Sequence, residues 1–210
     1  MKQKLLIVGA GSVGKFIAYN INNFNQDFEI IGFLDDDISK KETIIAGFKV
    51  LGLVSMLEEF SKNNIAIVWG IAFPSIKKRL AKKYEHLEFD YPNFISENAW
   101  ISRGVTFGKG CIIYPGCNIN YETEIQDFVV MNMNCAIGHN CKINSFTSLS
   151  PGVNLGGNTK IGSEVELGIG CATLQGVSIG EKVKVGGQAM VTKSFENNQI
   201  VKGIPAKSFK

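Results

Sequence analysis

The residue best suited to acid–base chemistry in this 210-residue chain is His139, one of two histidines. It lies in the segment AIGHNCKI and is followed directly by Asn140. A neutral imidazole suits a general base near pH 7, and the Asn140 amide oxygen could orient the ring as a carboxylate does elsewhere, without the charge. We therefore take His139 as the candidate base and Asn140 as its orienter. The alternative is a histidine tolerated on an exposed corner.

A glycine-rich segment near the N-terminus is typical of a nucleotide-binding turn. The segment GAGSVG, from Gly9 to Gly14, matches the pattern G-x-G-x-x-G between a predicted strand and a predicted helix, and Asp35 follows 21 residues after Gly14. Glycines allow close backbone approach to a pyrophosphate, and an acidic residue can bind a ribose hydroxyl. The pattern fits NAD(P), but the α/β region is about half as long as a two-lobed dinucleotide fold. We therefore expect another nucleotide diphosphate, with a purely structural turn as the alternative.

An acidic triplet, Asp35, Asp36 and Asp37, follows the second predicted strand. Ligands of open α/β sheets bind at the carboxyl ends of the strands, so these carboxylates could accept hydrogen bonds from a base or a ribose. A solvated turn is the alternative.

Large apolar residues recur every six residues in the second half of the chain. Stepping by six from Ile95 to Val191 meets 17 positions, of which 16 are large and apolar; Thr173 is the exception. This period is typical of a parallel β-helix, in which three hexads form one triangular coil. The segment therefore predicts a prism of about five to six coils. The flat faces of such a prism commonly pack against copies of the same chain.

From Ile101 onward, the position two residues before each member of this series is always small. It holds all five cysteines, namely Cys111, Cys117, Cys135, Cys141 and Cys171. We expect them to be compact spacers in a narrow interior rather than metal ligands or redox-active thiols. Glycine often follows the large apolar residue, and we expect a positive φ or a tight corner there: Gly108, Gly138, Gly156, Gly162, Gly168, Gly180 and Gly186.

The first ninety or so residues lack the six-residue period. They contain three predicted strands (KLLIVGA, FEIIGFLDDD and NNIAIVWG), a predicted helix after the glycine turn and another at PSIKKRLAKKY. We expect a small Rossmann-like α/β domain over residues 1–92. A repeat domain would occupy residues 93–210, with the polar tail folded back over the last coils.

Charge and composition argue against several classes of partner. The formal net charge is +3 and the basic residues are scattered, which indicates neither a nucleic-acid partner nor a membrane surface. The first apolar run is about five residues long, too short for a signal peptide or a membrane span. An odd number of cysteines suits a reducing compartment. We expect a cytoplasmic protein that needs no metal.

Taken together, the glycine-loop domain, the hexad repeat, the mid-repeat segment AIGHNCKI and the terminal segment VKGIPAK resemble the bacterial sugar O- and N-acyltransferases of the NeuD/PglD type. The resemblance covers nearly the whole chain. It implies a left-handed β-helix, a homotrimer and acetyl-CoA as cosubstrate. The acceptor would be an amino group on a nucleotide-linked sugar, often a 4-amino-4,6-dideoxy sugar destined for surface glycans such as O-antigen lipopolysaccharide. Other members act on hydroxyls.

The resemblance also implies roles for individual residues. His139 matches the catalytic base, and Gly157 matches the glycine whose backbone N–H meets the thioester carbonyl. Ile169 and Gly187 match positions that line the CoA groove between neighbouring subunits, and Lys193 and Pro205 are expected to extend this site. The nucleotide-sugar loop and the residues near its base are matched by Gly9, Gly11, Ser12, Gly14, Asp35 and Asp36.

The chain departs from the family pattern at four places. Asn140 stands where the family usually has an acidic residue, and Ser148 where it often has a second histidine. We interpret Ser148 as a hydrogen-bonding residue of the acceptor or acetyl pocket. The glycine loop lacks the common family histidine, and Lys77 aligns with a family arginine that would help to bind the substrate. These departures leave the sugar nucleotide open.

The sequence is also compatible with other functions. One is O-acetylation of a sialic-acid-like sugar, and another is a non-catalytic trimer that binds a nucleotide sugar. A nicotinamide-dependent oxidoreductase is a third alternative. The sequence does not distinguish UDP, dTDP and GDP as the nucleotide, nitrogen and oxygen as the acylated atom, or acetyl from other acyl groups.

Overall fold

The computed structural model describes residues 2–24, 27–60 and 65–209. The chain divides into two compact units, one made of Met1–Ala72 and Ile76–Pro92 and the other of Phe73–Ser75 and Asn93–Lys210. We call them the N-terminal unit and the repeat unit.

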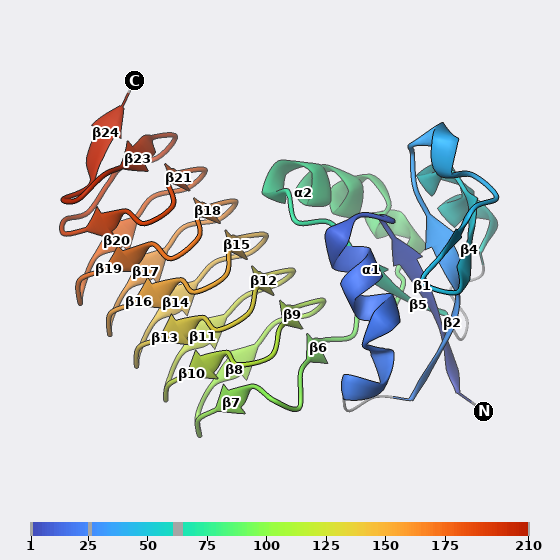
Figure 1. Ribbon diagram of the computed structural model, residues 1–210, viewed down its shortest axis with the longest axis horizontal. Helices are drawn as coiled ribbons and strands as arrows, with labels where there is room; N and C mark the ends of the chain where they lie inside the picture. The colour runs from blue at the N-terminus through green and yellow to red at the C-terminus, as the bar shows by residue number, and fades with distance from the viewer. Residues whose placement is uncertain (1, 25–26, 61–64, 210) are drawn as a thin grey trace. The chain divides into compact units, whose positions relative to one another are not determined.

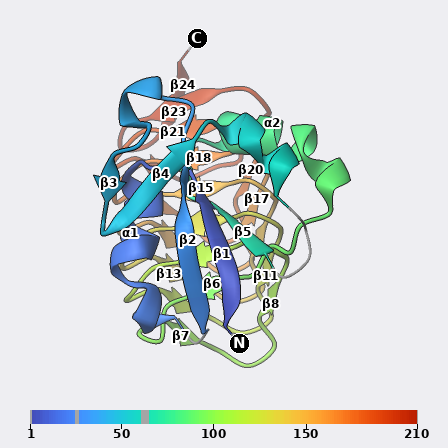
Figure 2. The ribbon, with the colours of Figure 1, turned by 90° about the vertical axis from the view of Figure 1, so that its right-hand side faces the viewer.

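The N-terminal unit is built on a five-stranded sheet in the order β3-β4-β2-β1-β5 (Figure 2). Four of its strands are parallel, and β3 pairs antiparallel with β4. The strands are β1 (Gln3–Val8), β2 (Phe28–Leu34), β3 (Ile44–Ile45), β4 (Phe48–Gly52) and β5 (Ile65–Trp69). Residues Leu5, Leu6, Ile7 and Val8 of β1 are fully buried. This burial explains their continuous apolar run, because a central parallel strand is covered on both faces.

The helices lie where the sequence predicts them. Helix α1 (Ser12–Tyr19) follows the glycine turn and buries Val13, Ile17 and Ala18, and α2 (Pro74–Lys83) begins at a proline. Within the described ranges, the connections also contain four short 3₁₀ helices: η1 (Ile21–Asn23), η2 (Ile38–Lys40), η3 (Val54–Glu59) and η4 (Glu85–Leu87). The third expected strand, NNIAIVWG, corresponds to β5, although Asn63 and Asn64 lie outside the described residues.

The β3–β4 hairpin was not expected from the sequence. Its turn residues Ala46 and Gly47 both have positive φ, +51° and +83°. Two such residues make the turn that matches the twist of a hairpin. The pair Ala-Gly gives a weaker sequence signal for this turn than Asn-Gly does, so the hairpin was missed.

The repeat unit is a parallel β-helix whose two-residue strands stack into three sheets (Figure 1). We call these sheets the first, second and third faces. The first face contains β7 (Trp100–Ile101), β10 (Asn118–Ile119), β13 (Ala136–Ile137), β16 (Asn154–Leu155), β19 (Ala172–Thr173) and β22 (Met190–Val191). The second face contains β8 (Thr106–Phe107), β11 (Glu124–Ile125), β14 (Lys142–Ile143), β17 (Lys160–Ile161) and β20 (Ser178–Ile179).

The third face closes each coil and carries the end of the chain. It contains β6 (Phe94–Ile95), β9 (Ile112–Ile113), β12 (Val130–Met131), β15 (Ser148–Leu149), β18 (Glu166–Leu167), β21 (Lys184–Val185), β23 (Ile200–Lys202) and β24 (Lys207–Phe209). Strand β24 turns back antiparallel on β23. Elsewhere on the faces each residue pairs with the residue one coil further on, as Asn118 does with Ala136. The structure thus confirms three hexads per coil.

The corners of the coils follow one backbone rule. Every sixth residue from Gly104 to Gln188 has a positive φ, between +55° and +80°. Glycine and asparagine occupy many of these positions, but the rule also holds for Glu122, Phe128 and Lys182. A left-handed residue at each corner therefore comes from the coil geometry and not from a glycine requirement.

The glycines that follow the large apolar residues serve a different purpose from a positive φ. None of them lies in the left-handed region, and the left-handed residue comes two positions later. A Cβ at Gly156 would lie 2.6 Å from the backbone nitrogen of Gln175, and one at Gly162 would lie 2.6 Å from that of Glu181. These glycines allow successive coils to approach closely at the corners, so the positive-φ half of the expectation was wrong and the tight-corner half is confirmed.

The interior of the repeat unit contains the two predicted registers. All five cysteines are free thiols with at most 1% exposure, and they pack among the large apolar residues. Burial raises the pKa of the Cys171 thiol to about 12 and also raises that of Cys141. Both effects disfavour the reactive thiolate, which confirms the cysteines as interior spacers.

This burial makes a prediction about thiol reactivity. In the native protein we expect Ellman's reagent to label essentially none of the five cysteines. All five should react within minutes in concentrated urea, because unfolding exposes them and restores their ordinary pKa. Absorbance of the released thiolate measures both. Rapid labelling of even one thiol in the native state would contradict the interior placement.

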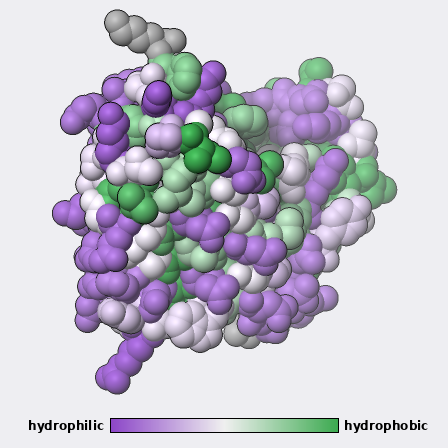
Figure 3. All heavy atoms as spheres, turned by 60° about the vertical axis from the view of Figure 1, so that its left-hand side comes forward, coloured by the Kyte–Doolittle hydropathy of each residue, from purple (hydrophilic) through white to green (hydrophobic). Residues whose placement is uncertain are grey.

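The surface of the repeat unit mixes polar and apolar side chains, as the view in Figure 3 shows. Its exposed apolar residues include Trp100, Tyr121, Met133, Ile169 and Leu174. No helix in the described ranges is long and apolar enough to span a membrane. Among the same residues, no group of three or more His, Cys, Asp or Glu side chains is placed to hold a metal ion.

Candidate active site

His139 lies at the corner where the first face meets the second, between β13 and β14. Its half-buried ring stacks on the Tyr121 ring, with centroids 5.2 Å apart and planes 11° apart. Tyr121 occupies the same corner one coil earlier. The ring atom Nδ1 lies 2.8 Å from Asn140 Oδ1. The stacking and this hydrogen bond together fix the imidazole, so the contact expected of Asn140 is present.

Gly157 occupies this corner one coil after His139. A Cβ at Gly157 would lie only 2.7 Å from His139 Nε2, so the glycine leaves the space beside that nitrogen open. The Gly157 carbonyl accepts a hydrogen bond from Gly176 N–H at 2.9 Å, whereas the Gly157 N–H makes none within the described part of the chain. A ring nitrogen and an unused backbone donor therefore lie close together. That combination can take a proton and stabilise a nearby oxyanion.

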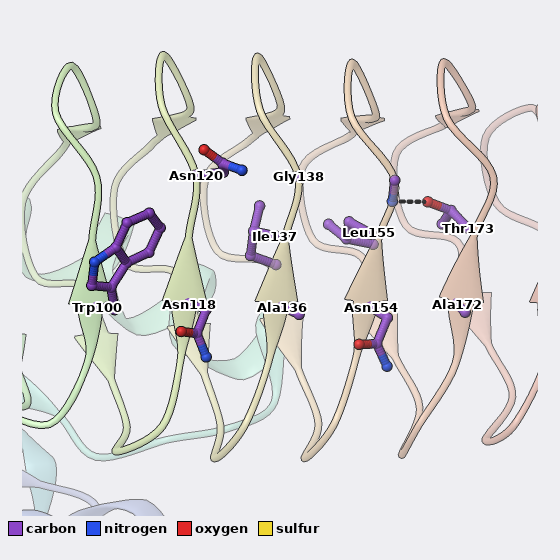
Figure 4. Close-up of a pocket in the computed structure, with 11 residues that line it drawn as sticks. Trp100, Asn118, Asn120, Ala136, Ile137, Gly138, Asn154, Leu155, Ala172 and Thr173 are labelled. Atoms are coloured by element: carbon purple, nitrogen blue, oxygen red, sulfur yellow. Dashed lines mark hydrogen bonds between the residues drawn. The ribbon is translucent and has the colours of Figure 1, made fainter.

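A shallow groove of about 470 Å³ runs along the first face and reaches this corner (Figure 4). Small residues keep it open, since Ala136, Gly138, Gly156 and Ala172 all line it. Trp100 lies at one end, and Gly138 leads directly into His139. The groove extends over five successive strands of the first face, from β7 to β19, and two of its lining glycines, Gly138 and Gly156, directly precede His139 and Gly157.

Thr173 interrupts the backbone ladder beneath this corner. In the preceding coil the Gly138 N–H donates to the Leu155 carbonyl, so the equivalent Gly156 N–H would be expected to donate to the Thr173 carbonyl. It donates instead to the Thr173 hydroxyl at 3.0 Å, which Figure 4 marks as a dashed line. The Thr173 hydroxyl also meets Thr159 Oγ1 at 3.1 Å in the interior. The one polar residue of the apolar series thus supports the glycine pair next to His139.

We expect Thr173→Val to lower the free energy of unfolding by about 1–3 kcal/mol, because the partly buried Gly156 N–H loses its partner. Urea denaturation measures this change. Thr106→Val, which alters an exposed residue of β8, is the matched control and should stay within about 0.5 kcal/mol. Equal small effects for the two variants would show that the Thr173 hydroxyl contributes nothing.

The glycine loop of the N-terminal unit lies at the carboxyl end of β1. A Cβ at Gly9 would lie 2.9 Å from the carbonyl oxygen of Gly70, and a Cβ at Gly14 would overlap the Gly9 carbonyl. Gly11, by contrast, has open space around it and is the N-cap of α1, next to the exposed Ser12. Gly9 and Gly14 are therefore needed for packing, while Gly11 and Ser12 are free to meet a ligand.

The carboxylates of the acidic triplet make hydrogen bonds within the N-terminal unit. Asp35 accepts hydrogen bonds from Ala10 N–H at 2.7 Å and from Lys40 Nζ at 3.1 Å. Asp36 Oδ1 accepts one from Val54 N–H at 3.0 Å. The exposed Asp37 accepts from Ser39, and these hydrogen bonds lower the pKa of its carboxyl. Asp35 thus holds the glycine loop against the end of β2, and Asp36 is the exposed carboxylate next to it.

Comparison with known proteins agrees with this architecture. The sequence model of the PglD N-terminal domain matches residues 4–84. The acetyltransferase domain of PglB from Neisseria gonorrhoeae FA1090, in complex with acetyl coenzyme A, is 28% identical, with a TM-score of 0.91 over 100% of both chains. The N-terminal unit thus matches the PglD N-terminal domain, and the chain as a whole is similar to sugar acetyltransferases of the PglD/NeuD type. A comparison with curated proteins found no match.

Two more distant structures show the same fold. One is a histidine-to-asparagine mutant of perosamine N-acetyltransferase from Caulobacter crescentus in complex with CoA and GDP-perosamine. It is 22% identical, with a TM-score of 0.92 over 99% of this chain and 97% of that one. The other is WeeI from Acinetobacter baumannii AYE, which is 23% identical, with a TM-score of 0.84 over 98% and 99%. The repeat unit is accordingly the left-handed β-helix of PglD/NeuD-type proteins.

Other residues expected from the PglD/NeuD pattern lie apart from His139 within one chain. Ile169 and Gly187 stack at the corner between the third and first faces, where a Cβ on Gly187 would lie 3.2 Å from the Ile169 carbonyl oxygen. Ser148 begins β15 on the third face, which does not border the His139 corner. Lys193 and Pro205 are exposed near the end of the chain.

Lys77 is buried, whereas a lysine that binds a ligand at the surface would be exposed. Its side chain is only 1% exposed on α2. The expectation that it binds the nucleotide sugar therefore requires a ligand that reaches into the N-terminal unit. His86 is exposed and lies 3.3 Å from Glu58 Oε2, which agrees with a solvated loop residue.

Two neighbours of His139 were missed at the level of sequence, namely Tyr121 and Glu122. The Asn140 amide nitrogen donates to Glu122 Oε2 at 2.7 Å, across 18 residues of sequence. The signal that could have found them is the coil length, since 18 residues before His139 and Asn140 stand Tyr121 and Glu122.

Proposed function

We propose that this protein transfers the acetyl group of acetyl-CoA to the amino group of a nucleotide-linked sugar, with His139 as the general base. The observation that carries this proposal is the placement of His139 Nε2 beside Gly157, with its unused N–H, next to the glycines Gly138 and Gly156 that line an open groove. The full-length likeness to an acetyltransferase domain that binds acetyl coenzyme A supports it.

The chemistry follows from these two groups. The sugar amine attacks the thioester carbonyl while His139 Nε2 takes its proton. The carbonyl oxygen gains negative charge, which the Gly157 N–H stabilises without reorganisation. When the C–S bond breaks, the thiolate of CoA takes the proton back from the imidazolium. The amide C–N bond has then formed and the base is regenerated. No covalent enzyme intermediate is needed, and all five cysteines are buried away from the groove.

The two units would bind the two substrates. Gly11, Ser12 and the exposed Asp36 are available for the nucleotide sugar at the carboxyl end of the parallel sheet. The relative from Caulobacter crescentus binds GDP-perosamine, a nucleotide-linked amino sugar. We therefore propose an acceptor of this class, such as a 4-amino-4,6-dideoxy sugar, used in the cytoplasm to make O-antigen or lipopolysaccharide.

The CoA site would require more than one chain. His139 with Gly157, and Ile169 with Gly187, flank the first face at opposite edges of a single prism. In a homotrimer these edges can meet across a subunit boundary. We propose this assembly, with Lys193 and Pro205 near the distal end of CoA.

The experiment combines the protein with acetyl-CoA and UDP-, dTDP- and GDP-linked 4-amino sugars, and detects acetylated product by mass spectrometry. Product from one nucleotide class would establish N-acetylation and the nucleotide preference together. Product only from a hydroxyl acceptor, such as a sialic-acid-like sugar, would replace N- by O-acetylation. Absence of acetyl-CoA binding would rule out the transferase and favour a non-catalytic nucleotide-sugar-binding protein.

A further inference from the structure

We propose that Glu122 is a positioning residue for His139 and acts through the side-chain amide of Asn140. Its carboxylate would fix the orientation of that amide, and the amide would fix which ring nitrogen of His139 carries the proton. This inference rests on the proposed function, because it explains how Nε2 is kept free to act as the base. Asn140 and not an acidic residue follows His139, so the Glu122 carboxylate acts on the ring through one intervening amide.

The order of donors and acceptors follows from Glu122. An ionised carboxylate can only accept hydrogen bonds, so the group that faces Glu122 Oε2 at 2.7 Å must be the Asn140 NH₂. The Asn140 carbonyl oxygen is then left for the ring, at 2.8 Å from Nδ1. Because this oxygen also only accepts, Nδ1 must carry the proton. His139 Nε2 is thereby left with its lone pair, on the side where Gly157 leaves space.

Asn140 alone would not enforce this order. The oxygen and nitrogen of an amide have nearly the same size, so a flipped Asn140 fits the same space. The flipped amide would donate to Nδ1 and place the ring proton on Nε2, which could then no longer accept one. In the flipped state the Asn140 oxygen would also face the Glu122 carboxylate, with no proton between the two acceptors. The Glu122 charge makes that arrangement unfavourable.

Glu122 also supplies negative charge to the site. Hydrogen bonds in a chain polarise one another, so the carboxylate makes the Asn140 oxygen a better acceptor for the imidazolium that forms in the reaction. The coil before His139 contributes Tyr121 and Glu122 to its surroundings, and the coil after contributes the non-titrating Gly157 and Asn158. Glu122 is therefore the only carboxylate in this relay.

The coil geometry holds the relay in place. Glu122 and Asn140 occupy equivalent corner positions, with φ of +55° and +56°. The Asn140 N–H donates to the Tyr121 carbonyl at 3.0 Å, and the Asn158 N–H donates to the His139 carbonyl at 2.8 Å. Three successive coils are thus joined by backbone hydrogen bonds at this corner. The relay lies on rigid structure, as an orienting group requires.

The test begins with a readout that does not depend on turnover. Nitrogen-15 NMR of the imidazoles reports the tautomer, and with two histidines in the chain His139 is assigned by comparison with His86→Ala. We expect the Nδ1–H tautomer in the wild type and a mixture with Nε2–H in Glu122→Ala. An unchanged Nδ1–H tautomer in Glu122→Ala would overturn the inference, whether or not the proposed reaction occurs.

Kinetics provide the second readout. We expect Glu122→Ala to lower kcat about tenfold, with KM for acetyl-CoA unchanged, and to move the acid limb of the kcat profile to lower pH because a negative charge near the imidazole is lost. Glu124→Gln is the matched control, since Glu124 lies on β11 two residues away and pairs with Lys142 on the surface. It should change neither kcat nor the pH profile.

A donor–acceptor exchange separates positioning from a purely structural role. Asn140→Asp alone should lower kcat, because its carboxylate would face that of Glu122 at hydrogen-bond distance. Combining Asn140→Asp with Glu122→Gln restores complementarity, since the amide introduced by the second change donates to the new carboxylate, which in turn accepts from Nδ1–H. We expect the kcat of this double variant to return to within about threefold of wild type. Additive losses in the double variant would overturn the inference.

Discussion

His139→Ala is expected to lower kcat by about a thousandfold, since a positioned general base contributes about 10²–10⁴-fold. The stacked ring on Tyr121 and the Asn140 hydrogen bond are lost with it, but the backbone of the corner is held by its own hydrogen bonds. We therefore expect the fold and the dissociation constant of acetyl-CoA to be preserved. Steady-state kinetics with the identified acceptor, together with calorimetric binding of acetyl-CoA, measure the two effects.

The other histidine is the natural control for this variant. His86→Ala removes an exposed imidazole whose contact is with Glu58 in the N-terminal unit, so kcat should stay within about twofold. The proton-transfer role would be contradicted if His139→Ala raised KM and left kcat unchanged, because such a result indicates lost binding rather than lost chemistry.

The β-helix could be predicted because the residues that pack in its interior recur at regular positions in the sequence. Each hexad turns one large apolar residue and one small spacer inward, so burial imposes the six-residue period that is typical of a parallel β-helix. The same register identified the five cysteines as interior residues. Thr173 is the one polar residue of the apolar series, and its hydroxyl replaces a backbone carbonyl as the acceptor for the Gly156 N–H. Its role could not be predicted, since a buried hydroxyl gives no sign of its partner.

The active-site corner was only partly predictable. His139, Asn140 and Gly157 were identified through the family pattern, and the structure brings them together. Tyr121 and Glu122 were missed because they contact His139 and Asn140 between coils, and a search along the chain reads neighbours in sequence. For the acidic triplet, in contrast, the residues were identified but their role was not. The sequence left open whether Asp35 binds a ligand, and in the structure its two oxygens accept hydrogen bonds from Ala10 N–H and Asp37 N–H.

Gly157→Ala is the second substitution with a large expected effect, a loss of about a hundredfold in kcat/KM, because the loss of one oxyanion donor costs about 10²–10³-fold. Gly157 does not lie in the left-handed region, so alanine introduces no backbone strain there. Its methyl group would instead stand 2.7 Å from His139 Nε2 and keep the reacting carbonyl away from the backbone N–H. The imidazole can move to relieve the contact, so the thermal midpoint should change little while the geometry of catalysis is lost.

Gly176→Asn tests whether a new side chain at this edge of the prism is harmful in itself. Gly176 lies one coil beyond Asn158, at a position where Asn140 and Asn158 already adopt a positive φ, and nothing lies within 4 Å of a Cβ built there. This variant should therefore fold and keep its activity. If Gly157→Ala were as active as Gly176→Asn, the space beside Nε2 would not be where the thioester reacts, because a carbonyl cannot share that volume with a methyl group.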